Sequence, residues 1–121
     1  MWRPSLGLLV CISCLVCLVA CGSALSSAKN DFRGGHVAEA KDKLIALEPE
    51  SRSWTGSRKA EYVLYRGLVH HALGDRETAL VWLKQARAME DARPGTLSDD
   101  DKTRLDLALD AADLPTDSMI R

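Results

Sequence analysis

The hydrophobic pattern of the chain changes near residue 29. No charged residue occurs from Pro4 to Ala28, whereas roughly a third of the later positions are charged. In the later part, apolar residues recur every three or four positions, which is the period of an amphipathic helix. Strand-like runs of Val, Ile and Thr are missing there, and glycine and proline divide it into short segments. The pattern therefore predicts an all-α domain.

Turn residues define the expected helices. Gly34 with Gly35, and Gly74, are placed to end helices and begin turns. Asp75 is expected to cap the helix that follows it, and Ser98 to start the last helix, with Asp101 as the partner in a capping box. The expected helices cover residues 25–33, 36–47, 58–73, 76–90 and 98–112, with loops over residues 49–56 and 91–97.

The first 20 residues have the pattern of an export signal. Arg3 precedes an apolar run of 15 residues from Leu6 to Ala20. That length fits the hydrophobic region of a secretory signal and is shorter than the roughly 20 residues that span a bilayer. The run ends in Leu-Val-Ala-Cys-Gly at positions 18–22, which resembles the processing site of bacterial lipoproteins.

This resemblance implies that the chain is cut before Cys21 and that the Cys21 thiol carries a diacylglyceryl group. The following Gly22 is not the Asp that often retains such proteins in the inner membrane. The resemblance thus implies a lipid-anchored protein of the bacterial cell envelope, at the outer membrane and facing the periplasm. Three other interpretations remain open: an uncut signal anchor, cleavage after Ala24, and a eukaryotic signal.

The four cysteines share this N-terminal segment. Their spacing resembles that of iron–sulfur ligands in bacterial ferredoxins, but Gly22 stands where that motif has proline. All four would lie on one face of an apolar helix, where cysteine acts as a small hydrophobic residue. Cleavage before Cys21 would leave no other thiol, so neither a disulfide nor a zinc–thiolate site is expected.

Small residues in the later part resemble a known helical repeat. Gly67, Gly74, Ala79 and Ala86 have the spacing of the tetratricopeptide repeat, in which small residues mark the places where two antiparallel helices cross. An earlier hairpin matches less well, because Leu47 replaces the late alanine. The resemblance implies two antiparallel helical hairpins plus a C-terminal capping helix. The expected boundaries are 1–20 for the signal, 21–112 for the domain and 113–121 for the tail.

The same resemblance implies a partner-binding groove. In that family the first helix of each unit lines a concave surface that is suited to a short peptide or a partner helix. The matching positions in this chain are Leu25, Lys29, Phe32, Glu61, Leu64, Leu68 and His71.

Motifs for catalysis or metal binding are not found. Adjacent His70 and His71 would point about 100° apart on a helix and so cannot chelate one metal. The acidic run from Asp99 to Asp101 lacks the glycine and bidentate glutamate of a helix-loop-helix calcium site. Nucleophile motifs and phosphate-binding loops are missing too. We therefore expect no catalytic residue, metal or cofactor. A net charge of −1 does not favour nucleic acid as a partner.

Together these features suggest a non-catalytic, membrane-anchored adaptor. It would bind a protein partner and help to assemble or tether an envelope complex of the secretion, pilus, motility or outer-membrane machinery. The alternative is a periplasmic small-ligand or cell-wall-binding module with a pocket near Trp54 and Tyr62. Aromatic residues are common both in such sites and in packing between hairpins.

Overall fold

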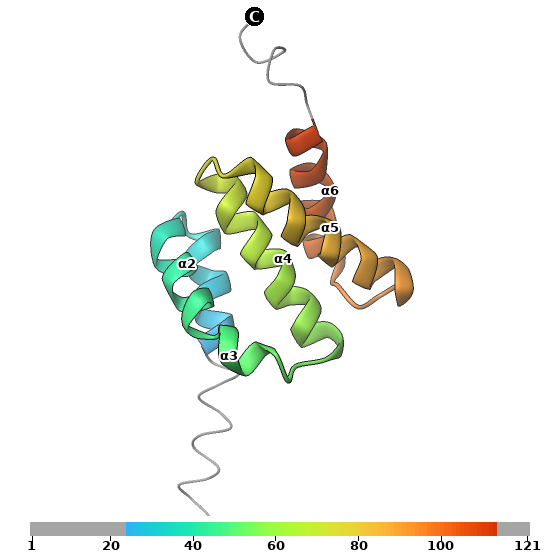
Figure 1. The fold of residues 1–121 in the computed structure, drawn as a ribbon, viewed down its shortest axis with the longest axis horizontal. Coiled ribbons are helices and arrows are strands. Elements are labelled where there is room, and N and C mark those ends of the chain that lie inside the picture. Colours follow the sequence, from blue (N-terminus) through green and yellow to red (C-terminus); the bar gives the residue numbers. More distant parts are fainter. Residues whose placement is uncertain (1–23, 114–121) are drawn as a thin grey trace, which may run out of the picture.

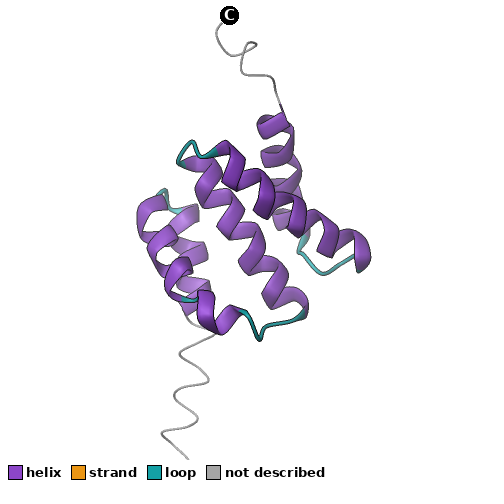
Figure 2. Ribbon diagram, in the orientation of Figure 1, coloured by secondary structure: helices purple, strands orange, loops and turns teal. Residues whose placement is uncertain are grey.

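The computed structural model describes residues 24–113, and all regular secondary structure in this part is helical (Figures 1 and 2). The expected all-α class is confirmed. The predicted signal peptide, Cys21 and residues 114–121 lie outside the described range. Between residues 24 and 113, no helix has both the length and the apolar character needed to cross a membrane. The helices cover residues 24–33 (α1), Val37–Ala46 (α2), Glu48–Ser51 (α3), Gly56–Ala72 (α4), Arg76–Ala92 (α5) and Asp99–Asp113 (α6).

Two antiparallel helix pairs, α1 with α2 and α4 with α5, form most of the domain. Helix α4 lies in the middle, in contact with α2, α5 and α6 (Figure 1). Both hairpin turns have a glycine at positive φ, Gly35 at 85° and Gly74 at 84°. Residues with a Cβ rarely adopt this conformation, so these glycines end the preceding helices as predicted.

The predicted helix caps are confirmed in part. The Asp75 side chain accepts a hydrogen bond from the Thr78 backbone N–H at 3.3 Å, and the Ser98 hydroxyl accepts one from the Asp101 backbone N–H at 3.2 Å. The Asp101 carboxylate, however, does not return to Ser98 as a capping box requires. It accepts a hydrogen bond from the Tyr65 hydroxyl in the domain interior. The capping-box prediction is therefore correct for only one of its two bonds.

The predicted loop over residues 49–56 contains a helix that the sequence interpretation missed. Pro49 stands in the first turn of α3. Backbone N–H groups there have no partner within the helix, so the missing N–H of proline costs no hydrogen bond. Proline was thus misread as a break when it begins a short helix. Helix α4 also starts two residues earlier than predicted, at Gly56.

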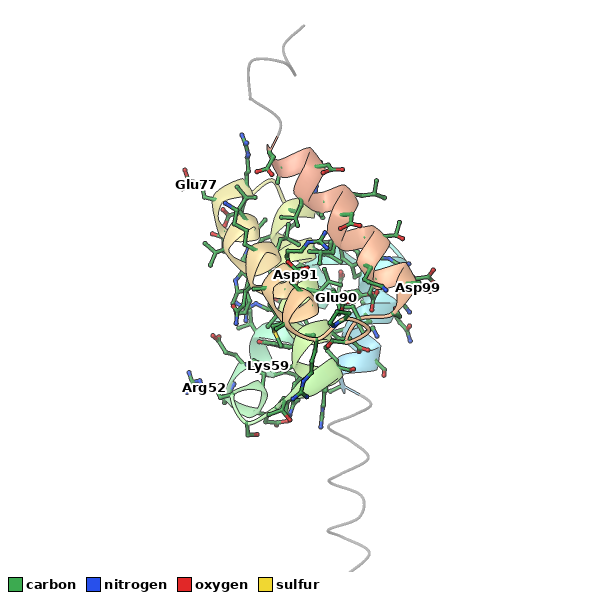
Figure 3. All side chains as sticks on the ribbon, turned by 90° about the vertical axis from the view of Figure 1, so that its right-hand side faces the viewer. Arg52, Lys59, Glu77, Glu90, Asp91 and Asp99 are labelled. Atoms are coloured by element: carbon green, nitrogen blue, oxygen red, sulfur yellow. The ribbon has the colours of Figure 1, made fainter. Side chains whose placement is uncertain are left out.

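Helix α5 continues two residues beyond the predicted end at Glu90. The Glu90 side chain turns back toward the following loop, where it accepts hydrogen bonds from the backbone N–H groups of Leu97 and Gly95, each at 2.8 Å (Figure 3). These bonds hold the pKa of Glu90 below its usual value. One carboxylate therefore binds two backbone N–H groups of the α5–α6 loop. Because α5 ends later than predicted, this loop is also shorter than expected.

The core surrounds α4 almost completely. Nine α4 residues are buried, whereas His71 remains partly exposed; the buried residues are Ala60, Tyr62, Val63, Leu64, Tyr65, Arg66, Gly67, Leu68 and Val69. Helix α4 is covered on several sides, so a one-sided apolar pattern underestimates its burial.

The crossing of α4 and α5 is unusually close at Gly67. A Cβ built on Gly67 would lie 2.8 Å from both Cγ and Cδ2 of Leu83, and 3.1 Å from the Leu83 backbone nitrogen. Leu83 has no exposed surface and cannot turn away. The missing side chain at position 67 therefore sets the distance between these two helices.

Substituting Gly67→Ala should destabilise the domain by up to about 2 kcal/mol. Overpacking typically costs about 1–3 kcal/mol, and the better helix propensity of alanine recovers about 1 kcal/mol of this. Urea unfolding followed by circular dichroism would measure the change. The matched test is the same substitution in a Leu83→Ala background, where it should be nearly neutral. Equal losses in both backgrounds would contradict the close-crossing explanation.

Candidate functional site

The residues predicted to line a groove lie along the junction of α1 and α4. Leu25, Leu64 and Leu68 are 4%, 0% and 4% exposed, so they are part of the core. At the surface of the same junction, the Lys29 ammonium of α1 forms an ion pair with Glu61 Oε2 of α4 at 2.9 Å. The structure thus brings the predicted residues together, but this part of the junction is closed by contacts within the chain.

The junction opens toward the far end of α4. Phe32, Leu68 and His71 face three residues of α6, and the six together line a shallow recess of about 260 Å³. The α6 residues are Arg104, Leu107 and Ala108. Leu107 is 65% exposed, so the edge of the recess carries exposed apolar surface. This is the candidate functional site, and we call it the α6 recess.

Sequence reasoning missed the contribution of α6, which it treated only as a cap. The sequence does contain a signal: Leu105, Ala108, Leu109 and Ala112 share one face of this helix, and Leu107 lies outside that face. A leucine without a place in the core of its own helix is a candidate contact residue.

Beside the recess lies a buried carboxylate that joins three helices. Asp101 of α6 is 1% exposed, and its Oδ1 accepts the Tyr65 hydroxyl hydrogen bond at 2.9 Å. The same oxygen lies 3.4 Å from Nη1 of Arg104 and 3.8 Å from Nη2 of Arg33. The Phe32 ring packs edge-on against Tyr65, with the ring centres 5.7 Å apart. The Asp101 group thereby fixes α6 relative to α1 and α4.

The aromatic residues of the alternative ligand pocket are packed against each other. Trp54 and Tyr62 meet edge to face at 5.6 Å, and Tyr62 meets Trp82 in the same way at 6.3 Å. The Tyr62 hydroxyl donates a hydrogen bond to the Leu44 carbonyl and accepts one from Arg66. Tyr62 is only 1% exposed, so its ring and hydroxyl are already in use within the domain.

The candidate metal ligands point in different directions. His70 lies 3.6 Å from Asp75, and burial, followed by the charge of Arg66, lowers the pKa of His70, whereas His71 faces the α6 recess. Asp99 pairs with Lys102 at 2.9 Å, while Asp101 points into the interior. In the described part of the chain, His, Cys, Asp and Glu side chains do not gather in groups of three that would suit a metal ion.

Comparisons with known proteins give no match. No family model, no curated protein and no solved structure matches this chain. The geometry of the described residues is therefore the basis for the functional argument.

The hydroxyl of Tyr65 should titrate far above that of an ordinary tyrosine. Burial, followed by the charge of Asp101 and the hydrogen bond to it, raises the Tyr65 pKa from 10.0 to about 12. The folded state therefore holds this proton more tightly than the unfolded state, so its contribution to stability is complete below pH 10 and is lost as the pH rises toward 12. Absorbance titration at alkaline pH should detect this late component.

The Tyr65→Phe variant supplies the control for this titration. It should lack the component at about pH 12, and it should unfold more easily at neutral pH by about 1–3 kcal/mol, because Asp101 loses a buried hydrogen-bond donor. A late component that persists in Tyr65→Phe would assign the raised pKa to another group.

Proposed function

We propose that this chain is a non-catalytic, membrane-anchored adaptor that binds a protein partner of an envelope complex through the α6 recess. The observation that carries the proposal is the exposed apolar surface of this recess, with Leu107 at its edge. Exposed apolar surface with a polar rim marks a site of protein–protein contact. A recess of this size suits one or two apolar side chains of a partner segment.

The packing of small residues supports a tetratricopeptide-repeat-like arrangement. Ala79 and Ala86 have no exposed surface, and Gly67 lies at the close crossing with Leu83. Helix α6 follows the second hairpin and packs against both of its helices. Each such hairpin buries its apolar face on the next unit. The α6 recess lies where α1 of the first hairpin, α4 of the second hairpin and α6 meet.

The margin of the recess has the mixed character of a protein-binding surface. Arg104 lines it, and Arg33 lies nearby with 41% of its side chain exposed. The Arg104 side chain is 34% exposed, so both arginines contact Asp101 and still present surface to a partner. Arginine is enriched at interfaces because its planar group forms several directed hydrogen bonds.

The membrane anchor in this proposal is the lipid at Cys21. It is supported by the sequence of the export signal, in which Leu-Val-Ala-Cys at positions 18–21 follows the apolar run. The proposed location is the bacterial envelope, at the outer membrane and facing the periplasm, in a secretion, pilus, motility or outer-membrane assembly system.

The test of this function is crosslinking of the tagged full-length protein in cells, followed by mass spectrometry. The informative variant is Leu107→Gln, which removes apolar surface from the recess without adding charge. We expect one dominant partner in the native protein and at least tenfold less of it with Leu107→Gln, which corresponds to an interface residue worth about 1.4 kcal/mol.

The matched control is Val81→Gln on α5. Val81 is 68% exposed, close to the 65% of Leu107, but it does not line the recess. The Val81→Gln substitution should leave the amount of crosslinked partner unchanged. Equal capture by the native chain and both variants would reject the recess as the binding surface. A Leu64 substitution is unsuitable here, because Leu64 has no exposed surface and its loss would unfold the core.

A further inference from the structure

The start of α1 lies at the same end of the domain as α3 and the start of α4. The Lys43 ammonium donates a hydrogen bond to the Ser27 hydroxyl at 2.9 Å, which places the last turn of α2 beside the first turn of α1. Helix α3 follows α2 directly, and α4 begins five residues after α3 ends. Figures 1 and 3 show these segments together at the lower end of the molecule.

Cations gather at this end. Figure 3 shows Arg52 and Lys59 there. Arg58 lies in the first turn of α4, and Arg93 meets Gly56 in a second recess of about 250 Å³. We call Arg52, Arg58, Lys59 and Arg93 the basic end. The nearby carboxylates are Glu50 and Asp91, which are exposed, and Glu48, which lies 3.6 Å from Arg66.

The cations of α4 do not stabilise their own helix. The positive end of the helix dipole lies at the N-terminus, where acidic side chains are favourable and basic ones are not. The first turn of α4 holds no acidic residue, and Thr55 forms no side-chain cap. The Lys59 ammonium donates a hydrogen bond to the Ser51 carbonyl at 2.8 Å, and the Arg58 guanidinium lies over the Trp54 ring. These contacts hold both cations at this end without neutralising their charge, which an external anion can meet.

An aromatic residue completes this surface. The Arg58 guanidinium lies over the Trp54 ring, 4.0 Å from its centre, and the other contact of that ring is the edge-on one with Tyr62. Trp54 is only half-buried. Tryptophan beside basic residues is typical of surfaces at the membrane–water interface, where the ring sits at headgroup level.

The opposite end of the domain has a different charge pattern. Helix α6 runs in the same direction as α4, because Asp101 meets Tyr65 and Leu107 lies by Leu68 and His71. Its last turns thus lie about 25 Å from the basic end, which is the length of α4. Exposed carboxylates at this far end are Asp75, Glu77, Asp110 and Asp113 (Figure 3 shows Glu77). Arg76 stands between Asp75 and Glu77, and Lys41 lies near Asp75, so this end carries charges of both signs with the carboxylates in excess.

We propose that the basic end rests on an anionic phospholipid surface, on the same bilayer that holds the lipid of Cys21. This inference rests on the proposed lipid anchor. Two residues lie between Cys21 and Ala24, so the two Cα atoms lie within about 11 Å of each other. This short connection keeps the start of α1, and the end of the domain to which it belongs, close to the bilayer, where the attraction of anionic headgroups acts over about a Debye length. The α6 recess, at the other half of α4, then faces away from the membrane.

The test uses the full chain, processed and lipidated in cells, purified and inserted into vesicles. Trp82→Phe leaves Trp54 as the tryptophan of the mature chain, since Trp2 is removed with the signal. Vesicles with brominated acyl chains contain either phosphatidylglycerol with phosphatidylcholine or phosphatidylcholine alone. We expect severalfold stronger quenching of Trp54 in the anionic vesicles, and loss of that difference in high salt.

Two double variants identify the contact. Arg52→Glu with Arg93→Glu reverses two exposed cations of the basic end and should reduce quenching to the level seen with phosphatidylcholine alone. Arg76→Glu with Lys84→Glu makes the same charge change on α5, away from the basic end, and should leave quenching unchanged. Circular dichroism verifies that both variants fold.

The outcomes separate this inference from the proposed function. The mass of the N-terminal peptide shows whether Cys21 is acylated, and an unmodified cysteine would refute both the anchor and the membrane contact. A lipidated chain whose Trp54 is quenched equally in both kinds of vesicle, or in neither, would refute the basic end alone. Partner capture at the α6 recess would be unaffected by that second result.

Discussion

The close approach of α4 and α5 at Gly67 is the constraint on which the rest of the domain depends. Because position 67 has no side chain, Leu83 fits directly against the backbone of α4. This contact makes α4 the centre of the domain, with α5 close on one side and α2 and α6 against its other surfaces. A central helix must bury residues in nearly every direction, including some that carry polar groups.

Two tyrosines show how the structure accommodates that burial. Tyr62 and Tyr65 are 1% and 0% exposed, and each hydroxyl finds a partner on a different neighbouring helix. Tyr62 donates to the Leu44 carbonyl of α2, and Tyr65 donates to Asp101 of α6. Buried polar groups cost stability unless they are hydrogen-bonded. These bonds therefore fix which surface of α4 faces which neighbour.

Much of the fold was predictable because it depends on local signals. Gly74 followed by Asp75 is a strong mark of a turn between helices, and the spacing of Ala60, Val63 and Leu64 is strongly helical. The polar interior was not predictable. From the sequence, Asp101 is one of several acidic residues at the start of a helix, and only the folded structure places it beside Tyr65, 36 residues away.

The candidate site was predictable in part. Phe32, Leu68 and His71 were identified from sequence, whereas Arg104 and Leu107 depended on the docking of α6.

The buried Asp101 also affects the order in which the contacts of the domain can form during synthesis. Arrays of helical hairpins can begin to fold in any unit, since each unit contacts only its neighbours. Here the last helix supplies the carboxylate that the Tyr65 hydroxyl and Arg33 of the first helix both approach. During synthesis from the N-terminus, the Tyr65 hydroxyl therefore lacks its partner until α6, near the C-terminal end, has been made.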